Sequence, residues 1–142
     1  GSAITLQSGA PFTITTQVNS TNSFSAGALR ADVLRNPNLP HDRRTLGQWF
    51  DTAAFVQPVP FRFGNQGVNV LRGDGIMDFA FSVLRNFQVR EDRQVQFRAE
   101  LFNLFNHPNF GIPGRTFGGP GFGLVSSAGP ARRIQLGVRM TF

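Results

Sequence analysis

The sequence contains no cysteine, no lysine and no tyrosine. Without cysteine there is no disulfide framework, no thiolate metal site and no cysteine nucleophile. All 14 basic residues are therefore arginines, and with 8 acidic residues they give a formal net charge of +6. No apolar run approaches the roughly 18 residues that a membrane-spanning helix requires, and no window shows the apolar spacing of an amphipathic helix. These absences leave β-structure as the expected class.

Alternation of apolar and polar residues is the one regular pattern present, and it predicts strands. It predicts a β-hairpin over 76–106 with a short turn at Glu91 and Asp92, and it is cleanest in a terminal strand over 132–142. A weak strand region is expected over 1–16. The remaining segments are predicted to be a long loop over 17–75 and a Gly/Pro/Phe loop over 107–131. We therefore expect 1–142 to form a single β-rich unit.

Two environments produce clean alternation in strands of this length. One is a soluble antiparallel sheet with a single wet face, and the other is a transmembrane β-barrel with lipid outside and a polar lumen. One short turn between two long connections favours the barrel, although the missing tyrosine departs from the usual aromatic girdles. The expected fold is an all-β antiparallel meander of about four long strands. Such a meander is either a barrel segment or a sheet completed by self-association, because four strands leave two open edges.

Several sequence segments resemble a known family. They are WFDTAAF at 49–55, FGNQGVNVLRGDG at 63–75, FRAELFNLFNHPNF at 97–110 and RRIQLGVRMTF at 132–142. Together they are similar to the carboxyl-terminal end of Oar-like TonB-dependent outer-membrane receptors, and LQSGAPFT at 6–13 fits the same region. The resemblance implies part of a barrel of about 22 strands. The family also has an amino-terminal plug and a TonB-contacting segment, and neither is found here, so we expect a fragment or a repurposed end of such a receptor.

The resemblance also implies roles for particular residues. The apolar row that ends at Phe142 resembles the signal that the barrel-assembly machinery reads. Its members are Ile134, Leu136, Val138, Met140 and Phe142. The expected partners are outer-membrane lipid and that machinery, with self-association through open strand edges as a further possibility. The expected location is the bacterial outer membrane, with a secreted or periplasmic soluble protein as the alternative.

Catalytic and metal sites are not expected. His41-Asp42 could act with Ser20, Ser23 or Ser25, but no G-x-S-x-G motif is present and a surface turn after Pro40 is the simpler interpretation. A metal role for His107 would need partners such as Glu100 or Asp92, but they lie on or beyond a strand from it, so His107 is interpreted as a strand-to-loop corner. Neither Gly64–Gly67 nor Arg72–Gly75 has the strand-loop-helix context of a phosphate loop, so both are predicted to be turns. No cofactor is expected.

Aromatic residues in the loops are the ligand-contact candidates. They are Trp49, Phe50, Phe55, Phe117 and Phe122, which could stack on a carbohydrate or pack as a loop core. Nucleic-acid binding is not expected, because the arginines are scattered over strand faces. The function we expect is a structural and transport role in a receptor barrel. The alternatives are a stand-alone soluble β-rich binding or self-assembling module and a small hydrolase or metal-dependent enzyme.

Overall fold

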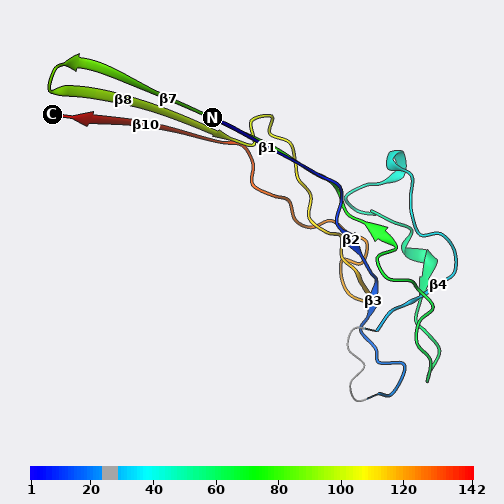
Figure 1. Cartoon of the computed structure of the whole chain (residues 1–142). Coiled ribbons are helices and arrows are strands. Elements are labelled where there is room, and N and C mark those ends of the chain that lie inside the picture. Colours follow the sequence, from blue (N-terminus) through cyan, green and yellow to red (C-terminus); the bar gives the residue numbers. More distant parts are fainter. Residues whose placement is uncertain (24–28) are drawn as a thin grey trace. The chain divides into compact units, whose positions relative to one another are not determined.

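A computed structural model describes residues 1–23 and 29–142 (Figure 1). The described residues form two compact units. The sheet unit consists of Gly1–Ser8, Gly75–Asn109 and Ala128–Phe142, and the loop unit consists of Gly9–Asp74 and Phe110–Ser127. Regular structure is almost entirely strand, with two short 3-10 helices, η1 (His41–Arg43) and η2 (Thr52–Ala54), in the loop unit.

One antiparallel sheet makes up the sheet unit. Its four strands lie in the order β1-β7-β8-β10. Their bounds are β1 Ser2–Gln7, β7 Ile76–Arg90, β8 Arg93–Phe102 and β10 Arg133–Thr141. The all-β, four-stranded antiparallel fold expected from the sequence is confirmed. Alternation was sufficient to find it because each long strand has one apolar side and one polar side.

The connections of this sheet differ greatly in length. Only Glu91 and Asp92 separate β7 from β8, and the pairing shifts register just before this turn, between Gln88 and Arg90. In contrast, residues 8–75 separate β1 from β7, and residues 103–132 separate β8 from β10. Both long connections leave from the same end of the antiparallel sheet, opposite the β7–β8 turn.

The loop unit has short strand pairs around an aromatic core. β2 (Pro11–Phe12) pairs with β6 (Leu71–Arg72), β3 (Thr15–Thr16) with β9 (Thr116–Phe117) and β4 (Asp32–Val33) with β5 (Phe55–Val56). The core cluster comprises Phe12, Ile14, Ala31, Trp49, Phe50, Ala54, Phe55, Leu71 and Val125. Two-residue strands carry no alternation, and this is why the sequence predicts loops over 17–75 and 107–131 and only a weak strand region over 1–16.

The two long connections fold together into this one unit. Trp49 N donates to Gly123 O at 3.0 Å, and Val125 N donates to Leu46 O at 2.8 Å. Gly123 has a φ of +81°, and a Cβ there would lie 2.5 Å from Thr52 Cγ2. A left-handed backbone without a side chain is therefore required at Gly123, where the second connection crosses the first.

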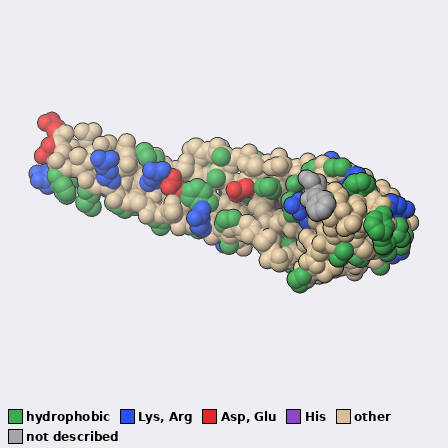
Figure 2. All heavy atoms as spheres, turned by 90° about the horizontal axis from the view of Figure 1, so that it is seen from below, with side chains coloured by type: hydrophobic (Ala, Val, Ile, Leu, Met, Phe, Trp, Pro, Cys, Tyr) green, Lys and Arg blue, Asp and Glu red, His purple; other side chains and the backbone are tan. Residues whose placement is uncertain are grey.

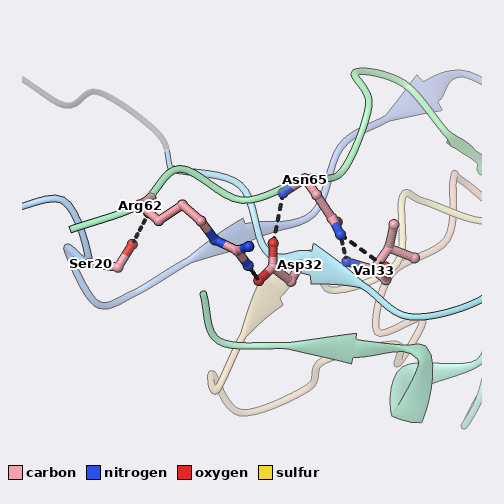
Figure 3. A network of polar contacts seen from close by, with 5 residues as sticks. All are labelled: Ser20, Asp32, Val33, Arg62 and Asn65. Atoms are coloured by element: carbon pink, nitrogen blue, oxygen red, sulfur yellow. Dashed lines mark hydrogen bonds and ion pairs between the residues drawn. The ribbon is translucent and has the colours of Figure 1, made fainter. Parts of the chain in front are cut away.

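A buried carboxylate organises one side of the loop unit (Figure 3). Asp32, whose residue is 5% exposed, accepts hydrogen bonds from the Arg62 guanidinium and, at 2.7 Å, from Asn65 N. The Asn65 side chain accepts from Val33 N at 2.7 Å and donates to Val33 O at 3.3 Å. The Ser20 hydroxyl donates to Arg62 O at 3.1 Å. This network binds the segment 62–65 to β4.

We expect Asp32→Asn to lower the free energy of unfolding of the loop unit by about 1.5–3 kcal/mol, because it removes a charged acceptor from a buried network. Trp49 is the one tryptophan of the chain and is buried in this unit, so its emission during urea titration reports the transition. Asp42→Asn is the control, since Asp42 is exposed. Equal urea midpoints for the two variants would show that the network adds no stability.

Candidate functional site

The register of the sheet brings most of the apolar residues of the four strands onto one face. Ile134 lies opposite Leu101, which lies opposite Phe81, and the same alignment repeats every second residue along the strands. Because alternate side chains point to opposite sides of a sheet, the rows add up to a continuous surface, here called the apolar face. It comprises Ile4, Leu6, Met77, Phe79, Phe81, Val83, Phe87, Val95, Phe97, Ala99, Leu101, Ile134, Leu136, Val138 and Met140.

Many side chains of the apolar face are exposed. Leu136 is 79% exposed, Leu6 is 68% and Phe97 is 53%. In Figure 2 hydrophobic side chains are visible along the surface of the sheet unit, with arginine side chains beside them. An apolar surface continuous over four strands is much more than the scattered hydrophobic residues of an ordinary soluble surface, and such a surface marks contact with a membrane or a partner.

The opposite side of the sheet, here called the polar face, carries most of the charges and amides, together with three large apolar residues, Ile76, Leu84 and Phe102. Arg98 forms an ion pair with Glu100 at 2.5 Å, and Gln96 Nε2 donates to Asn86 Oδ1 at 2.9 Å across β7 and β8. Asp78 has one buried carboxylate oxygen with no hydrogen-bond partner among the described residues. Thr5, Ser82, Gln88, Gln94, Gln135, Arg139 and Thr141 also lie on this face. The polar face therefore suits water.

Arg85 is the exception on the apolar face. It lies opposite Phe97 in the register, and its Cζ is 5.2 Å from the centroid of the Phe87 ring. The aliphatic stem and the cation–π contact lower the free-energy cost of placing the guanidinium against an apolar surface. The apolar face thus tolerates one mid-strand charge that the alternation does not predict.

Both edges of the sheet lack a strand partner within the described ranges. β1 pairs only with β7, and β10 pairs only with β8. Four strands are too few to close a barrel, since the smallest barrels whose side chains fill the interior need about eight. The predicted row Ile134, Leu136, Val138 and Met140 lies on the edge strand β10, and Phe142 follows that strand in the same alternation.

Asparagines that the sequence interpretation did not single out hold the corner after β8. Asn103 is 6% exposed and has a φ of +49°, its amide donates to His107 O and Pro130 O, and its Oδ1 accepts from His107 N. Asn109 Oδ1 accepts from Met77 N at 2.8 Å. These bonds join the start and end of the second connection to β7. The repeated Asn in FNLFNHPN was the available signal, because asparagine tolerates a positive φ and bonds to nearby backbone.

The predicted aromatic ligand contacts have different environments. Phe50 is 0% exposed and Phe55 is 3% exposed, and both rings pack edge-on against Phe122. Phe117 is partly buried and also packs on Phe122. Trp49 differs, because its indole lines a cavity while its Nε1 donates to Arg72 O at 3.0 Å. The phenylalanines therefore support the core, and Trp49 is the member of this set that reaches a cavity.

The other polar candidates are not brought together. Ser20 and His41 line different cavities, the Ser20 hydroxyl is engaged by Arg62 O, and Ser25 lies outside the described residues. The His107 Nδ1 atom lies 3.3 Å from Asn109 Oδ1. Over residues 1–23 and 29–142, no group of three or more His, Cys, Asp or Glu side chains is arranged to hold a metal ion.

No helix in the part of the chain that the structure describes is long and apolar enough to cross a membrane. A four-stranded sheet with one apolar and one polar face is the pattern of a wall segment of a membrane β-barrel. The chain belongs to the family described as the outer membrane beta barrel domain, whose model matches residues 1–135. No curated protein and no solved structure matches the chain.

Membership of this family places the chain in the bacterial outer membrane. The family is generally structural or involved in transport rather than catalytic, in agreement with the non-enzymatic role expected from the sequence.

Proposed function

We propose that this chain is the carboxyl-terminal wall of a TonB-dependent receptor barrel and serves transport across the outer membrane. The observation that carries the proposal is the apolar face, which continues across all four strands while the reverse side of the same strands is polar. In a barrel wall the apolar face contacts lipid and the polar face lines the lumen. The segments shared with Oar-like receptors support the finer assignment.

The unequal connections give the wall an orientation. Outer-membrane barrels have short turns on the periplasmic side and long loops outside the cell. The turn at Glu91 and Asp92 is then periplasmic, and both long connections, which build the loop unit, are extracellular. The open edges of β1 and β10 pair with further strands, which close the barrel.

The polar face fits a channel or a plugged lumen. The ion pair between Arg98 and Glu100, together with the amides of Gln96 and Asn86, gives a surface of mixed charge that water or a plug domain can contact.

The row of Ile134, Leu136, Val138, Met140 and Phe142 has a second role in this proposal. Its side chains project from an edge strand whose outer backbone groups have no partner strand in the described ranges. An apolar strip on an unpaired edge is a suitable substrate for a machine that adds strands one beside another. We assign the row to contact with the barrel-assembly machinery.

Spin labels provide a direct test, because the chain has no cysteine of its own. Leu136→Cys and Gln135→Cys place a label on the apolar and the polar face of the same strand, one residue apart. In outer membranes, we expect oxygen to relax the label at 136 strongly and a water-soluble nickel chelate to relax it weakly. The label at 135 is expected to show the reverse ratio.

A second pair, Val83→Cys and Ser82→Cys on β7, repeats the comparison away from the edge. Equal chelate access at 82, 83, 135 and 136 would contradict a lipid-facing wall. Because the receptor assignment is finer than the wall assignment, uptake of a TonB-dependent substrate must be measured separately. If the labels show the expected lipid and water access but uptake of the substrate does not depend on this chain, the receptor role is rejected and the wall assignment stands.

A further inference from the structure

A cavity in the loop unit combines charged side chains with aromatic rings. Its volume is about 310 Å³, and it is lined by His41, Arg44, Leu46, Trp49, Asp74 and Phe110. This volume is at the lower end of the roughly 300–1,000 Å³ of small-molecule sites. Trp49 is buried, Arg44, Asp74 and Phe110 are half-buried, and His41 and Leu46 are exposed. Trp49 is thus the most buried of these residues, and His41 and Leu46 are the most exposed.

The backbone fixes Trp49 and Asp74 relative to each other. Trp49 Nε1 donates to Arg72 O at 3.0 Å, and Gly73 N donates to Ala10 O at 2.9 Å. A Cβ at Gly9 would lie 2.0 Å from Gly73 O, so only glycine allows the first connection to pass this close to the segment before Asp74. Asp74 is therefore presented from a rigid backbone, directly after the β2–β6 pair.

The Arg44 guanidinium is also held in place, but its terminal nitrogens remain available. Arg44 Nε donates to Leu39 O at 2.8 Å, and Arg44 Cζ lies 5.7 Å from the centroid of the Trp49 ring. Within the described ranges, no hydrogen bond or ion pair engages the two Arg44 Nη atoms or the Asp74 carboxylate. The cavity thus offers oriented donors, an acceptor on an anchored backbone segment and a partly apolar wall.

We propose that this cavity binds a sugar ring. A sugar hydroxyl both donates and accepts, so one ring can satisfy the Asp74 carboxylate and the Arg44 Nη groups together. Its less polar side packs against Trp49 and Phe110, which are aromatic rings of the kind that combine apolar area with defined orientation. The inference is independent of transport, because it rests only on residues of the loop unit.

The charges of the cavity favour a neutral ligand over an ionic one. An anion would be attracted by Arg44 but repelled by Asp74, and a cation would be attracted by Asp74 but repelled by Arg44. A neutral polyol also avoids the cost of removing its own charge from water. A purely apolar ligand would leave both charged groups desolvated and without partners. A neutral, hydroxyl-rich ring can bond to Asp74 and Arg44 together while it packs against Trp49 and Phe110.

The test is calorimetric titration of the protein, purified in detergent from outer membranes. The probes are glucose, galactose and N-acetylglucosamine, with phenylalanine and inorganic phosphate as comparison ligands. We expect saturable binding of at least one sugar, weakened at least tenfold by Asp74→Asn and by Arg44→Gln. The matched controls Asp42→Asn and Arg43→Gln are expected to bind like the parent, because these exposed neighbours do not line the cavity.

Asp74→Asn keeps the size of the side chain, and its urea midpoint, followed by Trp49 emission, shows whether it is folded. If Asp74→Asn binds sugar more weakly than the parent while its urea midpoint equals that of the parent, the result supports the proposal. Absence of binding by all three sugars overturns it, as does equal binding by the Asp74, Arg44 and control variants. Binding of phosphate or phenylalanine in place of a sugar identifies an ion or amino-acid site and also overturns it.

Discussion

Phe50→Ala is expected to lower the free energy of unfolding of the loop unit by about 3–5 kcal/mol. Phe50 is fully buried, and its ring contacts Phe12, Phe55 and Phe122 at centroid distances of 5.2–6.0 Å. Truncation removes buried area and leaves a cavity where residues from both long connections meet, and the rigid backbone around Gly123 limits the collapse that could fill it.

Urea titration followed by Trp49 emission measures the effect, and limited proteolysis of 9–74 provides a second readout. Phe63→Ala is the control, since Phe63 is 65% exposed and its removal is expected to change stability by no more than about 0.5 kcal/mol. If Phe50→Ala unfolds at the parent's urea concentration, the two connections do not share a core that matters for stability.

Leu136→Arg is expected to lower the stability of the folded wall in the membrane by about 2–4 kcal/mol and to reduce its outer-membrane yield. This is the range for an arginine on the lipid side of a barrel near the middle of the bilayer. Leu136 is in the middle of β10, opposite Ala99 on the apolar face. The charge would have to leave lipid or take water with it, and Arg85 on the same face is itself a cation, so it offers no compensating charge.

Gln135→Arg is the matched control, because it adds the same side chain one residue away on the polar face. Its yield is expected to equal that of the parent, since lumen substitutions mainly alter selectivity. The measurement is the heat-modifiable folded fraction of each variant in outer membranes. Equal folded fractions for Leu136→Arg and Gln135→Arg would mean that the two faces do not contact different surroundings, lipid on one side and water on the other.

In the proposed wall, the two units bury their apolar residues in different surroundings. The sheet places its apolar face against lipid, so the side chains of this face are exposed when the chain is considered alone. The loop unit instead buries its aromatic residues against one another, as a water-soluble protein does.

The long strands were determined by the sequence alone. In β10 and in the β7–β8 hairpin, alternation fixes which residues share a face, because the side-chain period of a strand is two. The corner at His107 was also readable, since asparagine and proline mark such turns. These are local properties, and each depends on residues close together in the chain.

Only the tertiary structure decided what the long connections do. Phe50, Phe55 and Phe122 are core residues because Gly123 and Val125 cross Leu46 and Trp49, a contact between segments more than 70 residues apart. Arg44 and Asp74 share a cavity because the β2–β6 pair and Trp49 bring the end of the first connection back to η1. Such contacts leave no periodic pattern in the sequence, because two-residue strands and single hydrogen bonds are too short to produce one. The contacts form only when distant segments close into loops and pack against one another.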